Sequence, residues 1–367
     1  MSSEFEWIER QDDLDKLVRH LKKYDELPLD TEADNMYHYR NRICLFQLRA
    51  GQETFLIDAL AGLDFTGFVR LLEGKLLIMH GSDFDLRLMA DHHGFQPARL
   101  FDTMLGAQLL GLSKIGLGGL TEHYLGIEMP KGHQKSDWSR RPLPEKMLLY
   151  AAEDVLYLLE IRARMESELR TKGRVEWLRQ RCSWQIEAAR AGFGDRDENA
   201  WRLPGANRLG PRGLAVLHEL WHWRERSAEK ADLPPFKIIN NQFLMDIARA
   251  IDRDPKGDWR KIVPARLFSR HRRALEKAVK QGLALDPATL PRRTGEPRTR
   301  HPFTAEELER QEALREERDR RAEELGIDPS LIANRAQLAI LSRESVDADD
   351  LLLPWQADLL KEVLTER

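Results

Sequence analysis

The chain has 367 residues, of which 42% are hydrophobic and 32% charged, and its formal net charge is −3. This length exceeds one core of ordinary size, so we expect two or three domains, and the composition is that of a globular rather than a disordered protein. The longest apolar runs are too short to span a bilayer, and the acidic N-terminus lacks the layout of a signal peptide, so we expect a cytoplasmic protein. The two cysteines, Cys44 and Cys182, provide neither a disulfide framework nor a zinc cluster.

Charge is distributed unevenly along the chain. Residues 201–300 contain 22 Lys and Arg against 11 Asp and Glu, a net charge of +11, whereas residues 301–367 carry −8, which leaves −6 for residues 1–200. A basic segment between two acidic ones is typical of a surface that binds a polyanion, but basic side chains that only solvate helices would give the same charge.

The first half of the chain alternates strand and helix patterns. Alternating or short apolar runs predict strands at 5–9, 27–31, 43–48, 53–58 and 75–80, with an antiparallel hairpin over 43–58. Apolar residues at helical spacing predict helices at 12–24, 63–72, 83–94, 102–112, 117–125 and 145–168, the last one after a loop at 130–144. Mixed strands and helices over about 190 residues predict an α/β domain with one open sheet.

The second half has an all-helical pattern. It follows a stretch rich in Gly, Asp, Asn and Pro at 192–212, and helices are expected at 214–230, 242–250 and 272–281. A Pro-rich linker at 286–302 precedes a charged helix at 304–325, which Thr304 and Glu307 would begin as a capping box. We therefore expect three domains, at 1–195, 205–285 and 300–367.

Acidic residues occur where predicted strands end. Asp30 and Glu32 are two apart on the predicted strand 27–31 and its end, so their carboxylates project from the same face of a sheet. Such a pair is common by chance, but Asp30 follows apolar residues, and a buried carboxylate needs a cation or a partner. Asp85 follows the strand at 75–80 and falls in the first turn of a helix, where an acid is also favourable for local reasons. Asp83 is placed to cap that helix.

One predicted helix adds a phenol and a further carboxylate. Tyr150 and Asp154 are four residues apart and therefore share one face of the helix. Ala151 and Ala152 lie between them and are small enough to allow close approach to a sheet, while we expect Glu153 to point to solvent.

These residues together form the pattern Asp-x-Glu, Asp, Tyr-x-x-x-Asp. Hard oxygen ligands without His or Cys suit Mg²⁺ or Mn²⁺ rather than zinc. Two such cations about 3.5–4 Å apart are a known arrangement for cleaving phosphodiesters, in which one activates water and the other stabilises the leaving oxygen. The pattern therefore indicates a site for two divalent cations.

Three segments resemble the exonuclease motifs of the DEDD superfamily in its tyrosine-containing branch. They are Leu29-Asp30-Thr31-Glu32, His80-Gly81-Ser82-Asp83-Phe84-Asp85 and Tyr150-Ala151-Ala152-Glu153-Asp154. The segment 134–143 is similar to the one that precedes the third motif in the ribonuclease D family. The resemblance covers about residues 1–190 and implies a ribonuclease H-like α/β fold.

The resemblance also implies a role for each residue of the pattern. Asp30, Glu32 and Asp154 would hold the cation on the side of the nucleophile. Asp30 would also bridge to a second cation supported by Asp85, and Tyr150 would orient the attacking water as a general-base helper.

The helical remainder resembles the helicase-and-RNase-D C-terminal (HRDC) domain over residues 208–285. Residues 304–367 are similar to a second, divergent copy, and two such copies favour the ribonuclease D family over other members of the superfamily. This family membership implies a 3′→5′ exoribonuclease that releases 5′-mononucleotides in tRNA 3′ maturation. The implied partner is RNA with a single-stranded 3′ end, such as a tRNA precursor, and no obligate protein partner is evident.

Two sets of residues are expected to bind the substrate. Gln134 and Lys135 lie in the loop before the catalytic helix, and Arg270, Arg272 and Arg273 lie in the basic segment. Further members of these two sets are Lys131, His133, Arg266, His271, Lys277, Lys280, Arg292, Arg293, Arg298 and Arg300. A mobile loop and an ordinary solvated helix would have the same composition.

Three neighbouring residues are expected to be structural. We expect Phe46 and Trp138 to pack in the core, and His80 to be a satisfied residue at a strand end rather than a ligand.

Two other functions remain open at this point. The same five acidic and phenolic residues serve DNA 3′→5′ exonucleases of repair, and the sequence shows no contact that would recognise a 2′-hydroxyl. The second alternative is a nucleic-acid-binding protein with an inactive nuclease domain, which the intact set of five residues argues against.

Overall fold

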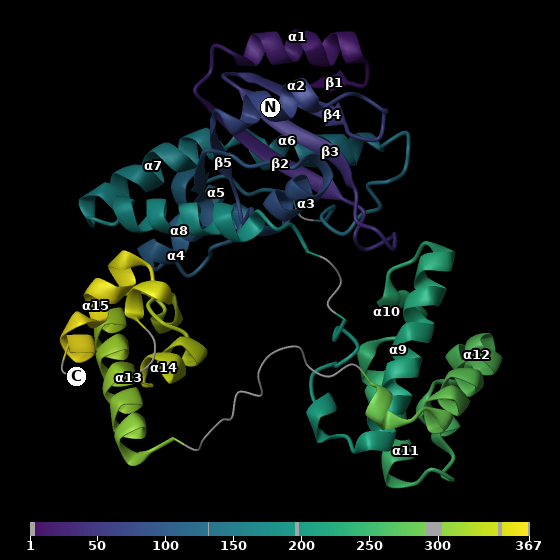
Figure 1. Cartoon of the computed structure of the whole chain (residues 1–367). Coiled ribbons are helices and arrows are strands. Elements are labelled where there is room, and N and C mark those ends of the chain that lie inside the picture. Colours follow the sequence, from purple (N-terminus) through teal and green to yellow (C-terminus); the bar gives the residue numbers. More distant parts are fainter. Residues whose placement is uncertain (1–3, 131, 195–197, 291–302, 344–346, 366–367) are drawn as a thin grey trace. The chain divides into compact units, whose positions relative to one another are not determined.

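The computed structural model of the chain describes residues 4–130, 132–194, 198–290, 303–343 and 347–365 (Figure 1). The chain forms two compact units. Unit 1 contains residues 1–33, 43–193 and 300–367, and unit 2 contains residues 34–42 and 194–299. Within the described ranges, no helix has the length and apolar character needed to cross a bilayer.

Unit 1 is built on one six-stranded sheet with the strand order β1-β4-β3-β2-β5-β6. Strand β2 is antiparallel to β3 and parallel to β5, so the sheet is mixed. Strands β3 and β4 form the expected antiparallel hairpin, which confirms the α/β open-sheet prediction. The strands are β1 (Glu6–Ile8), β2 (Glu26–Ala33), β3 (Ile43–Ala50), β4 (Glu53–Asp58), β5 (Leu76–Met79) and β6 (Arg99–Asp102).

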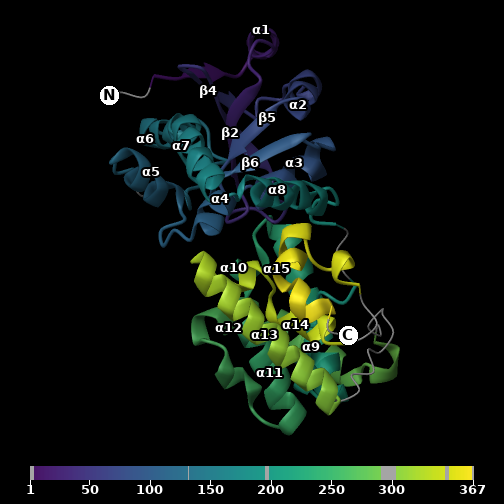
Figure 2. The same ribbon diagram turned by 90° about the vertical axis from the view of Figure 1, so that its left-hand side faces the viewer.

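Helices cover both faces of this sheet. Figure 2 shows α5, α6 and α7 on one side of the strands and α2 and α3 on the other. On the second side, Phe46 of β3 packs against Phe65 and Phe68 at ring-centroid distances of 5.3 and 5.6 Å, which confirms it as a core residue. The helices are α1 (Gln11–Leu21), α2 (Thr66–Glu73), α3 (Asp83–His93), α4 (Thr103–Leu110), α5 (Leu117–Leu125), α6 (Glu145–Leu156), α7 (Leu158–Thr171) and α8 (Val175–Ala189).

The prediction of a single helix at 145–168 is wrong, because the chain bends at Tyr157 and forms two helices. Its backbone angles, φ −104° and ψ −4°, end α6 at Leu156, and α7 then packs against α4 and α5. The sequence has no Gly or Pro at this bend, and its apolar residues keep helical spacing on both sides, so the sequence pattern did not reveal the break. Strand β6 and helix α8 were not expected from the sequence.

The expected role of Asp83 as a helix cap is also wrong. Ser82 is the N-cap residue of α3, and Asp83 lies inside the first turn, where it pairs with Arg87 at 3.1 Å. The expected helix at 102–112 is instead α4, and Asp102 is its cap, accepting hydrogen bonds from the backbone N–H groups of Met104 and Leu105.

The C-terminal helices belong to unit 1 and lie beside α4 and α8 (Figure 1). Trp355 stacks on Trp177 with ring centroids 4.7 Å apart. The buried Arg174 donates to the carbonyl oxygens of Leu109 and Leu325, which lie in the last turns of two helices, at 2.6 and 2.7 Å. The helices are α13 (Ala305–Leu325), α14 (Arg335–Leu341) and α15 (Pro354–Thr365), with 3₁₀ turns at Pro329–Leu331 and Ala348–Asp350. Whether this segment is a divergent HRDC copy stays a prediction.

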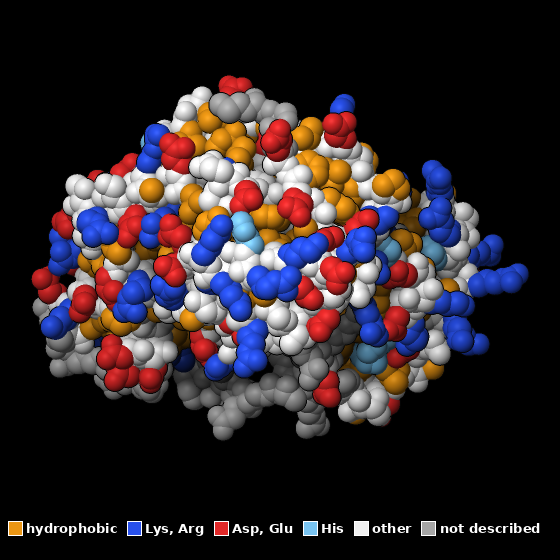
Figure 3. Space-filling model, turned by 90° about the horizontal axis from the view of Figure 1, so that it is seen from above, with side chains coloured by type: hydrophobic (Ala, Val, Ile, Leu, Met, Phe, Trp, Pro, Cys, Tyr) orange, Lys and Arg blue, Asp and Glu red, His pale blue; other side chains and the backbone are white. Residues whose placement is uncertain are grey.

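The capping box expected at the start of α13 is confirmed. Thr304 Oγ1 accepts from the backbone N–H of Glu307 at 3.1 Å, and the Glu307 carboxylate accepts from the backbone N–H of Thr304 at 3.0 Å. Further along the helix, ion pairs such as Glu317 with Arg320 link successive turns. On the face of the molecule drawn in Figure 3, Lys and Arg side chains are likewise interspersed with Asp and Glu.

Within the described residues, unit 2 contains helices and the loops between them, and no strand. Its core includes Trp201, Leu217, Leu220, Leu244 and Leu275, all fully buried. Its helices are α9 (Pro211–Ala231), α10 (Pro235–Ile238), α11 (Asn241–Arg253) and α12 (Ala265–Ala284), with 3₁₀ turns at Ala206–Arg208, Trp259–Ile262 and Pro287–Thr289.

Candidate active site

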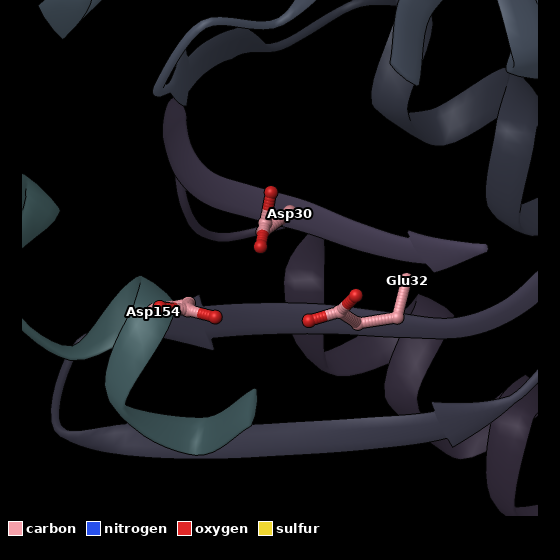
Figure 4. Close-up of side chains that lie close together, drawn as sticks. All are labelled: Asp30, Glu32 and Asp154. Carbon is pink, nitrogen blue, oxygen red and sulfur yellow. The ribbon is translucent and has the colours of Figure 1, made fainter. Parts of the chain in front are cut away.

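Three of the predicted carboxylates converge on one point in unit 1. Asp30 and Glu32 project from β2 and Asp154 from α6, and one carboxylate oxygen of each lies within 4.8 Å of the others (Figure 4). Helix α6 comes this close because Ala151 and Ala152, both fully buried, are the residues that pack against the sheet. The arrangement provides one position at which three carboxylates can bind a single cation.

Asp85 reaches the same region from the first turn of α3. It is buried, and its Oδ1 accepts a hydrogen bond from Thr31 Oγ1 at 2.5 Å. Thr31 lies between Asp30 and Glu32 on β2, so the catalytic strand itself fixes the fourth carboxylate. Asp85 is not one of the three carboxylates that meet at the single point, and its expected role beside a second cation stays a prediction.

Tyr150 lies one helical turn before Asp154 on α6, close enough for each residue to shift the pKa of the other. The edge of His133 faces the Tyr150 ring at a centroid distance of 5.9 Å, and Trp138 lies 6.3 Å away on a tilted plane. Trp138 is almost fully buried, which confirms it as a packing residue. The phenol is therefore held between the catalytic helix and the loop that precedes it.

The electrostatics of the site favour a bound cation. Burial, with the charges of Asp85 and Asp154, raises the pKa of Asp30 well above its usual range. Burial, together with the charge of Asp30 first among its neighbours, raises the pKa of Glu32 to about 10. Burial likewise raises the pKa of Asp85 to about 6 and of Asp154 to about 7. Buried carboxylates of this kind are stabilised in the charged form by a metal ion, so the donor set fits divalent cations.

The loop before α3 is held by a buried carboxylate that the sequence did not single out. Asp102 is fully buried and accepts hydrogen bonds from the backbone N–H groups of Gly81 and Ser82 at 3.0 and 2.8 Å. Gln185 of α8 donates to the same carboxylate at 3.0 Å. Because Asp85 follows this loop within one turn, Asp102 contributes to its placement. The loop at Gly81 and Ser82, Asp102 and helix α8 are brought together only by the fold, so no local sequence pattern predicts these contacts.

His80 has the structural role expected of it. Its Nδ1 lies 2.9 Å from Thr103 Oγ1, and Thr103 donates in turn to the carbonyl of Met79. The expectation for Glu153 is wrong, because the residue is half-buried and one carboxylate oxygen is shielded from solvent without a hydrogen-bond partner. Burial raises the pKa of Glu153.

The residues expected to bind substrate occupy two separate places. Gln134 and Lys135 are exposed in the loop before α6, which Arg141 anchors through Asp58 at 2.5 Å. The remaining three, Arg270, Arg272 and Arg273, are exposed on α12 of unit 2. Lys131, Arg292, Arg293, Arg298 and Arg300 lie outside the described residues.

Family models match both units. A 3′-5′ exonuclease model matches residues 5–170, and an HRDC domain model matches residues 213–257. The chain is 30% identical to a protein of Bartonella henselae named ribonuclease D, over 77% of this chain and 71% of that one. It is 28% identical to the ribonuclease D of Pseudomonas paraeruginosa, over 98% of this chain and 96% of that one.

A solved structure shares the fold. The crystal structure of Escherichia coli RNase D, described as an exoribonuclease involved in structured RNA processing, superposes with a TM-score of 0.73. The two chains are 24% identical, and the likeness covers 99% of this chain and 98% of the other. At this identity the comparison supports the α/β domain followed by helical domains, and nothing finer.

Proposed function

This chain belongs to the ribonuclease D family of 3′→5′ exoribonucleases, and we propose that it trims tRNA precursors from a single-stranded 3′ end, releasing 5′-mononucleotides. The observation that carries the proposal is the convergence of Asp30, Glu32 and Asp154, with one carboxylate oxygen of each within 4.8 Å of the others. Asp85 is fixed beside them by a hydrogen bond to the same strand. Among the described residues no ion pair joins these buried acids to a basic side chain, and such a set is costly to a fold unless it serves a cation.

We propose two divalent cations, Mg²⁺ or Mn²⁺, at this site. Asp30, Glu32 and Asp154 would hold the first, and Asp30 and Asp85 would hold the second. Such cations, when bound, activate a water molecule and stabilise the leaving oxygen of the phosphodiester.

Tyr150 would position the attacking water. Burial and the nearby charge of Asp154 raise the pKa of its hydroxyl above the ordinary value, so the phenol stays protonated at neutral pH. It can therefore donate or accept a hydrogen bond but does not carry a negative charge of its own. Its contribution would be to orient the attacking water through that hydrogen bond.

A basic stripe on α12 supports RNA binding by unit 2. We use the name basic stripe for Arg266, Arg270, Arg273, Lys277 and Lys280, which are exposed and follow one another at spacings of three or four residues. Residues at this spacing lie on one face of a helix, so five positive charges share one surface. Arg272 lies off the stripe and pairs with Glu276 at 3.5 Å, so we expect it to contribute less to binding.

The loop before α6 is the second proposed substrate contact. Gln134 and Lys135 are exposed there, and His133 of the same loop touches Tyr150. A cationic and an amide side chain in a loop that contacts Tyr150 suit contacts to the phosphates near the 3′ end.

We also propose a cytoplasmic location. Both cysteines, Cys44 and Cys182, are buried and are not joined in a disulfide. Cysteines that stay out of disulfides are typical of a reducing compartment.

The test is the degradation of a 3′-extended tRNA precursor and of a single-stranded DNA of matched length, with Mg²⁺, Mn²⁺ or EDTA. We expect stepwise, metal-dependent shortening of the RNA with 5′-mononucleotides as products, and no shortening by Asp154→Ala. Faster degradation of the DNA would replace the proposed substrate with DNA. Binding of RNA without cleavage under any metal would overturn the proposed activity.

A further inference from the structure

Gln47, on the central strand β3, has a buried polar side chain without a hydrogen bond to any described residue. It is fully buried, and within residues 4–130, 132–194, 198–290, 303–343 and 347–365 neither its amide nitrogen nor its amide oxygen has a hydrogen-bond partner. A primary amide carries two donor hydrogens and an acceptor oxygen, and buried groups of this kind are almost always hydrogen-bonded in folded proteins. An apolar residue at this position would avoid the free-energy cost of burying unpaired polar groups, so the presence of an amide requires an explanation.

The sheet register places Gln47 directly opposite Asp30. The antiparallel pairing of β2 and β3 aligns Asp30 with Gln47, and the pairing of β3 and β4 aligns Gln47 with Leu56. Side chains directly opposite each other in an antiparallel pair point to the same face of the sheet. The amide is therefore on the face that carries the catalytic carboxylates, between one apolar and one acidic neighbour.

Several of the groups next to Gln47 on this face are apolar. Leu45, two residues before it, and Leu56 belong to the apolar cluster beneath α6, together with Ala151 and Ala152. Of its two cross-strand partners, only Asp30 is polar. Phe46, the residue immediately before Gln47, points to the opposite side and packs against Phe68 of α2.

We propose that Gln47 is a positioning residue for Asp30, whose amide N–H donates to the Asp30 carboxylate when that carboxylate holds divalent cations. The inference rests on the proposed function, because Asp30 is the residue expected to contact both cations. A bridging carboxylate must keep one orientation, and a donor fixed in the neighbouring strand restricts its rotation. Hydrogen-bonded partners of metal ligands typically change metal affinity by about 10–100-fold.

The proposal predicts opposite effects on metal-free stability and on metal affinity. Gln47→Met keeps the length of the side chain and removes both polar groups. In EDTA its melting temperature should rise by roughly 2–6 °C, because an unsatisfied buried amide is no longer enclosed. Its dissociation constant for Mn²⁺, measured by electron paramagnetic resonance without substrate, should rise by about 10–100-fold.

Two further variants make the experiment decisive. Gln47→Leu repeats the test with a different shape, in case Met fails to pack. Leu45→Met changes an apolar residue of the same strand and face, opposite Glu32, and should leave Mn²⁺ affinity unchanged.

The possible outcomes separate this inference from the proposed function. Unchanged Mn²⁺ affinity in both Gln47 variants, or a lower metal-free melting temperature in both, would overturn the role of the amide. If the wild-type protein binds Mn²⁺ no better than Asp154→Asn, the proposed metal site itself falls, and the inference falls with it. Weaker Mn²⁺ binding with raised metal-free stability would support the proposal.

Discussion

Replacing Glu32 with Gln should stabilise the metal-free protein at neutral pH while abolishing its metal-dependent activity. Glu32 is buried among Asp30, Asp85 and Asp154, and its pKa of about 10 lies far above the ordinary value of 4.5. A folded-state pKa that is raised means that the fold favours the protonated carboxyl. The contribution of the protonated Glu32 carboxyl group to the free energy of unfolding is fully present below pH 4.5 and is lost as the pH rises towards 10. Gln has the shape of the protonated form and does not titrate.

The magnitude follows from the distance between the working pH and the ordinary pKa. In the unfolded chain the Glu32 carboxyl group has its ordinary pKa of 4.5 and is therefore ionised at pH 7. In the folded protein it must bind a proton at pH 7, which is 2.5 pH units above that pKa. One unit corresponds to about 1.4 kcal/mol, so Glu32→Gln should raise the free energy of unfolding by about 3 kcal/mol at pH 7. At pH 4 the wild type and the variant should be equally stable.

The assay is urea denaturation in EDTA between pH 4 and pH 9, repeated with saturating Mn²⁺. The difference between variant and wild type should grow with pH in EDTA and reverse in sign with Mn²⁺, because only the wild type gains a full set of ligands. Glu6→Gln, at an exposed position of β1, is the control and should show no pH-dependent gain. If Glu32→Gln raised the free energy of unfolding by the same amount at pH 4 and at pH 9, the argument from buried charge would be refuted.

Three further predictions concern activity and RNA binding. Tyr150→Phe should lower kcat on RNA by about 10²–10⁴-fold and leave Mn²⁺ affinity unchanged, and loss of Mn²⁺ binding would show instead that the phenol supports the ligands. Thr31→Val removes the hydrogen bond that fixes Asp85 and should lower kcat by about tenfold in single-turnover assays. Thr31→Ser keeps the hydroxyl and should retain activity, and equal loss in both variants would contradict the positioning role. Replacing Arg273 and Lys277 of the basic stripe with Ala should reduce the slope of log affinity for RNA against log salt by about 0.7 per residue, and an unchanged slope would remove α12 from the binding surface.

Short-range patterns in the sequence were enough to identify several parts of the site. The two-residue spacing of Asp30 and Glu32 and the four-residue spacing of Tyr150 and Asp154 each define a shared face within one strand or helix. The capping box at Thr304 is equally local, since its partners are three residues apart. Such features depend only on the geometry of a single element, so they could be predicted without knowing the fold.

Other features depend on contacts between segments far apart in the chain. The bend at Tyr157 carries no Gly or Pro, and it is set by the packing of α7 against α4 and α5. Asp102 was recognised only as the start of a helix, whereas it also holds Gly81 and Ser82. The expectation that Asp83 caps α3 failed because a short polar side chain can serve equally well as a cap or as an ion-pair partner.

The sequence by itself determined which residues can carry the chemistry, because residue type and local spacing fix the ligands and the faces from which they project. The tertiary structure decided how these residues are held. Thr31 meets Asp85 across 54 positions of sequence, and Gln47 faces Asp30 only through the register of two strands. Hydrogen bonds and strand register between distant segments are set by the packing of the whole domain, and no local pattern encodes them.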